Sequence, residues 1–309
     1  MAVRRCRPPR TLRFGSYEGL LQSLPSPMVS TNLVVDLAPL RWIEALSIAT
    51  LVAFLKSHMR LHPNTENYIA YPRRYEFLQR MDMFRAIGAD VPEKFQRQDE
   101  TGRFVPVREV DDSAGVPQAA EDIVQTLRIG DVDAARTLRH CIGEIVDNVF
   151  VHARSGVHAV ICAQHFPNAC RSQVAIVDTG IGLRQSFVES PAFSGISLDD
   201  RQALELALMP YVTSKPQTMV PYENSYGRLG VGLFIVSEVL DRVGGRLLLI
   251  SGRSAVDRRK SRKYWRSVKA WKGTIVGFEV PDEPSVSYED ALREARRMAR
   301  SKGRSPERE

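Results

Sequence analysis

Three polar residues recur at every fourth position of an otherwise apolar segment. Glu144, Asn148 and His152 lie within 139–152 (RHCIGEIVDNVFVH), so they share one face of the expected helix. A carboxylate, an amide and an imidazole on the flank of an apolar helix are costly to bury without polar partners. The spacing indicates a face that binds a polar ligand or a metal ion. A solvated polar stripe is the alternative for this segment taken alone.

A second chemical signal follows a buried strand. The apolar run 174–177 ends in Asp178, and Gly180 and Gly182 come directly after it. A carboxylate at a strand end can accept a hydrogen bond from an exocyclic amine, and glycines beside it leave room for a planar base. The same string also occurs in ordinary turns, which is the alternative for this motif alone.

Glycines also precede the expected helix at 232–243. Gly227, Gly230 and Gly232 lead into Leu233. Glycine-rich backbone at a helix N-terminus offers N–H donors and a favourable dipole to phosphate. The segment does not follow a strand and lacks the dinucleotide spacing, which excludes a Rossmann motif, and the chain has no GxxxxGK[ST] string, which excludes a P-loop.

The order and spacing of these motifs resemble the GHKL ATPases, a superfamily that includes DNA gyrase, sensor histidine kinases and the anti-sigma-factor serine kinases. The resemblance spans about 131–281 and is carried by Glu144/Asn148, Asp178/Gly180/Gly182, Gly227/Gly230/Gly232 and Gly273-Thr274. It implies an α+β chain with a Bergerat two-layer α/β sandwich and a mixed sheet.

The resemblance also implies ATP and Mg²⁺ as cofactors. Asn148 would coordinate Mg²⁺ on the triphosphate, and Glu144 would be the general base. Asp178 would bind the adenine amine, with Thr274 supporting it and Gly182 giving access to a water and the base. The other cofactor-binding candidates are Gly180 near the base, Gly227, Gly230, Gly232 and Leu233 at the phosphates, and Lys215 in the expected ATP lid.

Two features concern the branch of the superfamily. The pattern of Glu144, Asn148 and His152 is similar to that of the anti-sigma-factor serine kinases, which favours a true base at Glu144. His140 lies in the same helix and not on a separate hairpin, so we expect a core or helix-surface histidine and no phosphoacceptor.

The N-terminal part resembles a STAS domain, the kind of partner that such serine kinases have. It alternates strand 32–37, helix 45–58, strand 67–72 and helix 75–87. The family's phosphoacceptor turn reads EALS at 44–47 here. The usual acceptor serine is absent, so a docking or regulatory role is expected in place of phosphorylation in cis.

Composition divides the 309 residues into five segments. They are a basic flexible N-terminus at 1–27, the STAS-like domain at 28–97, a polar linker at 98–130 with a short strand at 104–107, the ATP-binding domain at 131–283, and a charged C-terminal helix and tail at 284–309. Two domains are therefore expected.

The net charge of +7 is concentrated in the N-terminus and in a loop between strands expected to end at 251 and begin at 274. That loop holds nine basic residues, one acid, and interleaved Tyr264, Trp265 and Trp271, so it could follow a nucleic-acid backbone or hold an acidic partner; a solvated hairpin is the alternative. No apolar run reaches the length of a membrane span, and four irregularly spaced cysteines fit reduced thiols. We expect a cytoplasmic protein.

The sequence thus predicts a slow ATPase that acts as a nucleotide-dependent regulatory switch through lid closure. A protein serine kinase of the anti-sigma-factor type is one alternative. A non-catalytic nucleotide sensor that binds nucleic acid or an acidic partner through the basic loop is another. An unidentified protein partner is expected, and the resembled families allow a homodimer.

Overall fold

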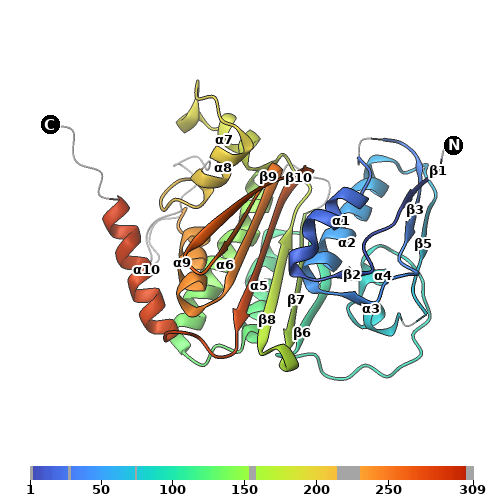
Figure 1. Ribbon diagram of the computed structural model, residues 1–309, viewed down its shortest axis with the longest axis horizontal. Helices are drawn as coiled ribbons and strands as arrows, with labels where there is room; N and C mark the ends of the chain where they lie inside the picture. Colours follow the sequence, from blue (N-terminus) through green and yellow to red (C-terminus); the bar gives the residue numbers. More distant parts are fainter. Residues whose placement is uncertain (1–2, 27–28, 74, 153–157, 214–229, 304–309) are drawn as a thin grey trace.

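The computed structural model describes residues 3–26, 29–73, 75–152, 158–213 and 230–303, without the side chains of 151, 152 and 303 (Figure 1). A five-stranded sheet lies at its centre, in the order β6-β7-β8-β10-β9. Its strands are β6 (Phe104–Val110), β7 (Ala159–Phe166), β8 (Arg171–Val177), β9 (Arg246–Arg259) and β10 (Arg262–Pro281).

The strand pairs of this sheet are antiparallel, where the expected sheet was mixed. A short turn joins β7 to β8, and a two-residue turn joins β9 to β10, so each returns beside its predecessor. β10 inserts between β8 and β9, which keeps these two similarly directed strands from pairing. The broader expectation of an α+β sandwich is confirmed.

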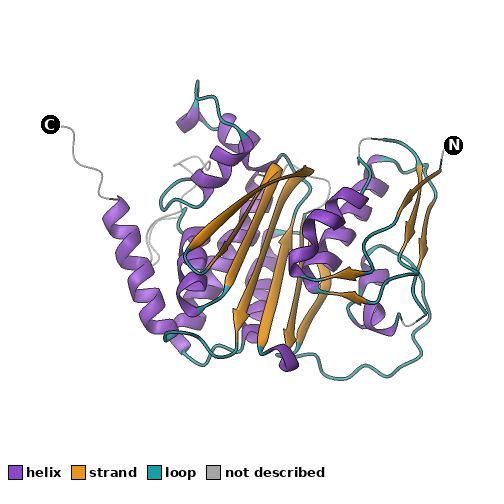
Figure 2. Ribbon diagram, in the orientation of Figure 1, coloured by secondary structure: helices purple, strands orange, loops and turns teal. Residues whose placement is uncertain are grey.

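Helices cover one face of the sheet (Figure 2). They are α5 (Val116–Leu127), α6 (Val132–His152) and α9 (Gly232–Val243), with α10 (Tyr288–Gly303) packed outside α9 and α6. Two short helices, α7 (Gly182–Val188) and α8 (Asp200–Ala207), lie at one end of this layer.

The opposite face is covered by the N-terminal part of the chain. Here α1 (Tyr17–Ser23) and α2 (Ala45–Leu61) lie on the sheet, with α2 against β7 and β8. Beyond them are a parallel sheet of β1 (Val3–Cys6), β3 (Asn32–Asp36) and β5 (Asn67–Ala70), a small pair of β2 (Thr11–Leu12) and β4 (Trp42–Ile43), and the helices α3 (Glu76–Arg80) and α4 (Met83–Ala86).

The sequence explains why both faces are covered. The central strands contain continuous apolar runs, AVICA at 159–163, VAIV at 174–177 and LLLI at 247–250, instead of the alternation of a half-exposed sheet. Alternate residues point to opposite faces, so Ile176 joins the core under α6 and α9 while Val177 joins the core under α2. Helix α2 is apolar all round and correspondingly buried.

Three expectations about the organisation differ from the structure. Segment 1–27 was expected to be flexible, but 3–23 contains β1, β2, a short 3-10 helix (Phe14–Ser16) and α1, and its side chains Leu12, Phe14 and Leu20 are buried. The expected linker at 98–130 contributes β6, which pairs with β7, and α5, which packs on α6. The expected helix at 75–87 is divided into α3 and α4 at Asp82, whose φ is 55°.

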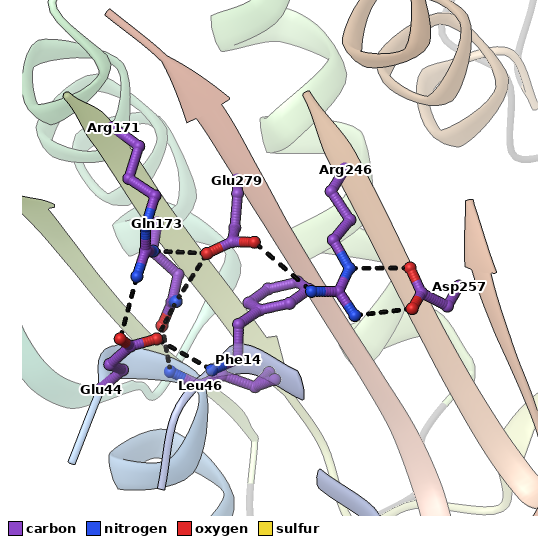
Figure 3. A network of polar contacts seen from close by, with 8 residues as sticks. All are labelled: Phe14, Glu44, Leu46, Arg171, Gln173, Arg246, Asp257 and Glu279. Atoms are coloured by element: carbon purple, nitrogen blue, oxygen red, sulfur yellow. Dashed lines mark hydrogen bonds and ion pairs between the residues drawn. The ribbon is translucent and has the colours of Figure 1, made fainter. Parts of the chain in front are cut away.

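A buried polar network fastens the N-terminal part to the sheet (Figure 3). The Glu44 carboxylate is fully buried and accepts hydrogen bonds from Phe14 N, Trp42 Nε1, Gln173 Nε2 and Arg171 Nη2. The Gln173 amide oxygen accepts from Leu46 N at 3.0 Å, in the first turn of α2. The N-terminal part and the central sheet are therefore one packed body, not two domains on a linker.

Candidate functional site

Helix α6 brings Glu144 and Asn148 to the wall of one cavity. The Asp131 carboxylate accepts from Ala134 N at 2.6 Å and caps the start of the helix. Glu144 is half-buried and Asn148 is exposed, so both side chains can meet a ligand from the solvent side. The side chain of His152, the third residue of the predicted stripe, lies outside the described residues.

Asp178 lies at the end of β8, on the same cavity. Its carboxylate accepts from Gly180 N at 2.8 Å and from Thr274 N at 3.1 Å, while Asp178 N donates to Thr274 O at 2.9 Å. Burial raises the pKa of Asp178 to about 6, against the lowering effect of the hydrogen bonds from Gly180 and Thr274. The result is a buried acceptor that changes protonation close to neutral pH.

Gly182 is required by the backbone itself. Its φ is 77°, and a Cβ atom there would lie 2.9 Å from Ser251 Oγ. Ser251 Oγ donates to Gly273 O at 2.8 Å and accepts from Leu183 N at 3.0 Å, so it joins α7 to β10. This constraint on Gly182 was not apparent from the sequence, and neither was the role of Ser251. Access of a water and the base past Gly182 stays a prediction.

The N-terminus of α9 faces Glu144. Gly232 N donates to Glu144 Oε2 at 2.8 Å, and a Cβ atom on Gly232 would lie only 2.5 Å from that oxygen. Gly230 has a φ of 82°, with Val212 O 2.9 Å from the position of a Cβ atom. The Gly232 amide predicted to hold phosphate has no side chain of its own beside it and is engaged by the Glu144 carboxylate.

The structure gathers most of the predicted residues around this cavity, which we call the nucleotide cavity. Those that line it are Glu144, Asn148, Asp178, Gly182, Gly230, Gly232, Leu233 and Thr274. Gly180 is buried behind Asp178 and binds it through its N–H. Lys215 and Gly227 lie outside the described residues.

Apolar side chains complete the walls of the nucleotide cavity, notably Ile176, Phe187, Leu249 and Val276. Its volume of about 120 Å³ is close to the roughly 150 Å³ that admits a benzene ring in an apolar core. Apolar walls beside the buried Asp178 carboxylate suit a planar aromatic group with a polar edge. Charged groups of the same ligand would extend toward Gly230, Gly232 and Asn148.

Comparison with protein families agrees with this geometry. Residues 133–284 match the family described as histidine kinase-, DNA gyrase B-, and HSP90-like ATPase. This match supports an ATP-binding domain of the GHKL type in this part of the chain. No curated protein matches the chain.

The GHKL match begins within α6, so it omits β6, α5 and the whole N-terminal part. The STAS-like resemblance of 28–97 and the similarity to anti-sigma-factor kinases therefore stay predictions. Ser47, the small residue of the expected phosphoacceptor turn, is 1% exposed in the first turn of α2. Phosphorylation of this turn in cis is not tested by its burial, and the docking or regulatory role stays a prediction.

His140 lies in the matched segment and contacts Glu144, a contact that the sequence analysis did not predict. Its Nε2 lies 3.4 Å from Glu144 Oε1, and this contact raises the pKa of His140 against the lowering effect of burial. The four-residue spacing from His140 to Glu144 was the available signal, because it places both on one helix face. Glu144 is thus held from one side by His140 and from the other by α9.

The basic loop expected between 251 and 274 is a continuation of β9 and β10 into a long hairpin. Arg258 pairs with Glu238 at 2.7 Å and with Asp241 at 3.2 Å. Trp271 is buried, and the guanidinium of Arg201 lies 4.7 Å from the ring centre of Trp265. Both indoles are engaged within the protein, which weakens the case for base stacking on this hairpin.

Among the described residues, no helix is long and apolar enough to cross a membrane. Cys141 and Cys162 are buried free thiols.

Proposed function

We propose that this chain is a slow, Mg²⁺-dependent ATPase whose nucleotide state acts as a regulatory switch. The observation that carries the proposal is the position of Glu144, which is held between His140 and the N–H of Gly232 at the end of the cavity nearest α9. A carboxylate at the phosphate end of an ATP site is suited to take a proton from an attacking water.

Each end of the nucleotide has a candidate partner. Asp178 would accept the exocyclic amine of adenine, with its carboxylate fixed by Gly180 and Thr274. The N–H groups that begin α9 would receive phosphate oxygens. Asn148 fits Mg²⁺ because its exposed amide oxygen is a hard ligand beside the phosphate end, and the bound ion would neutralise charge on the phosphates.

The contact between Glu144 and Gly232 suggests how hydrolysis is coupled to binding. While Glu144 Oε2 accepts from Gly232 N, that oxygen is engaged and the phosphate donor is occupied. A phosphate that takes over the Gly232 N–H releases the carboxylate toward water. His140 is then a positioning residue, since its ring lies against Oε1, the other oxygen of the Glu144 carboxylate.

Substitution of the base tests this proposal. Glu144→Ala should lower phosphate release by at least about 100-fold, because a positioned general base contributes about 10²–10⁴-fold. ATP affinity should be retained or increased, because the Gly232 N–H is freed. The measurements are steady-state phosphate release and calorimetric ATP titration. Glu189→Ala, at the end of α7 and outside the cavity lining, is the control.

Unchanged phosphate release in Glu144→Ala would contradict the assignment. The serine-kinase alternative uses the same base on a hydroxyl, so it predicts transfer of radiolabel from ATP to a protein, again dependent on Glu144. Transfer in place of phosphate release would favour that alternative.

A further inference from the structure

A second cavity lies behind the turn that carries Asp178. It has a volume of about 270 Å³ and is enclosed by the end of α1, the side of α2 and the stretch 269–272 of β10. Asp178 lines the nucleotide cavity, and Thr179, the next residue, lines this one. We call it the rear cavity. It exceeds the roughly 150 Å³ that takes up benzene, so it has room for a small organic molecule.

The rear cavity has apolar walls and a cationic mouth. Leu21, Phe54 and Trp271 are buried side chains of its interior. Arg253 and Lys272 are exposed at its edge, and none of the described residues that line it is acidic. Apolar walls favour a hydrophobic body, and two exposed cations at one edge favour an anionic group there.

This combination selects among ligand classes. A neutral apolar molecule would gain nothing from the cations at the mouth. A nucleic-acid strand would meet the cations but would not enter walls formed by Leu21, Leu24 and Phe54. The best match is a small amphipathic anion, with an aromatic or short aliphatic body and one carboxylate, sulfonate or phosphate group.

The two cavities share a rigid partition. Trp271 Nε1 donates to the backbone oxygen of Asp178 at 2.9 Å. Gly273 packs so closely on the same oxygen that a Cβ atom would lie 2.3 Å from it. A ligand that shifts Trp271 therefore acts on a hydrogen-bond donor to the backbone of Asp178, the residue proposed to bind adenine.

We propose that the rear cavity binds a small amphipathic anion and that its occupation changes the affinity of the nucleotide cavity for ATP. The coupling rests on the proposed adenine-binding role of Asp178, whereas binding in the rear cavity does not. By linkage, ATP must change the affinity of the anion by the same factor.

Fluorescence titration with anilinonaphthalene sulfonate tests the binding site, since this probe has an aromatic body and one anionic group. Arg253→Gln/Lys272→Gln should weaken binding about tenfold or more, because charge-assisted contacts are lost. The matched control is Lys260→Gln/Arg262→Gln at the tip of the same hairpin, which removes the same charge away from the rear cavity and should change affinity less than twofold.

Two further comparisons exclude binding elsewhere. N-phenylnaphthylamine, which has a similar body without the sulfonate, should bind at least about tenfold more weakly. Ala270→Trp, at an exposed position on the edge of the cavity, should block the probe. Equal affinity in the Arg253/Lys272 variant and wild type, equal loss in both double variants, or tight binding of the neutral molecule would each overturn the site.

The coupling is measured by ATP titration with and without saturating probe. The expected shift in ATP affinity is about fivefold or more in the wild type and absent in Arg253→Gln/Lys272→Gln. Probe binding that leaves ATP affinity unchanged would overturn the coupling alone. Failure of ATP to bind at all would instead contradict the proposed function, while the probe titration would still decide the rear cavity.

Discussion

The two faces of the central sheet bury similar apolar residues but treat their polar groups differently. Toward α2, the Glu44 carboxylate receives four hydrogen bonds, which fill the roughly four acceptor positions of a carboxylate. Toward α6 and α9, Asp178 receives its hydrogen bonds from Gly180 and Thr274 and borders a cavity. Full pairing marks a structural contact, and spare acceptor capacity beside a cavity marks a binding site.

The charged neighbours of the buried carboxyls also differ between the two sides of the sheet. Burial raises the pKa of Asp178 to about 6, and it raises the pKa of Glu279 in the network of Figure 3. The guanidinium groups of Arg171 and Arg246 oppose this rise at Glu279, whereas Asp178 has only the hydrogen bonds from Gly180 and Thr274 against it. The carboxyl without a cationic neighbour that lowers its pKa is therefore the one beside the cavity.

The largest expected effect on stability comes from removing the Glu44 carboxylate, which accepts the hydrogen bonds on the α2 side of the sheet. Glu44→Ala should lower the free energy of unfolding by about 3–5 kcal/mol, because it leaves several buried donors without their acceptor, although Arg171 keeps Glu279 as its other partner. Asp36→Ala, which removes the partner of the largely exposed Arg7, should cost about 1 kcal/mol or less. Denaturant unfolding measures both, and comparable small losses would contradict the structural role of the network.

On the α6 and α9 side of the sheet, a fall in pH is expected to weaken ligand binding through Asp178. As the pH falls from 7 to 5, Asp178 passes through its pKa of about 6 and becomes protonated. Its affinity for the adenine amine should then fall by up to about tenfold. Adenosine is the suitable ligand for this titration, because the phosphate groups of ATP also titrate near pH 6.

Protonation of Asp178 is expected to weaken adenosine binding but to stabilise the folded state. Because the pKa of Asp178 is raised by folding, its contribution to stability is fully present below pH 3.8 and is lost as the pH rises through about 6. Asp178→Asn should remove this pH dependence from adenosine binding, and the wild-type-minus-variant difference in unfolding free energy should fall as the pH rises through about 6. Parallel pH curves for wild type and variant would contradict the role of this carboxyl.

A smaller effect is expected at His140. His140→Ala should lower the rate of phosphate release about tenfold and leave ATP affinity nearly unchanged, because the ring positions Glu144 without touching the nucleotide. His140→Gln, which can still donate to Glu144, should recover part of the rate. A loss confined to ATP affinity would show that His140 acts in binding and not through Glu144.

The motifs predicted the nucleotide cavity because each one is local. Helical periodicity places Glu144 and Asn148 on one face, and a strand end places Asp178 before its glycines. The resemblance supplied the step that brings these segments together, and the structure places them around one cavity. The contact of His140 with Glu144 was not predicted, because a histidine on a helix has many ordinary environments, although the four-residue spacing between the two was visible in the sequence.

The N-terminal part could not be placed from the sequence. The apolar strands 159–163 and 247–250 require both faces of the sheet to be covered. No short sequence pattern predicts that α2 covers the second face. The contacts that decide it join distant segments, such as Leu46 with Gln173. Likewise, polar composition in 98–130 suggested a linker, because β6 and α5 are amphipathic elements that show their apolar side only to their neighbours.

Calorimetric titration of ATP, with and without magnesium, into wild type, Asp178→Asn and Asn148→Ala tests the central claim most directly. The account predicts magnesium-dependent binding by the wild type. It predicts that Asp178→Asn weakens binding about tenfold or more in either condition and that Asn148→Ala removes the magnesium dependence. Binding that neither substitution alters, in proteins that remain folded, would contradict the assignment of this cavity.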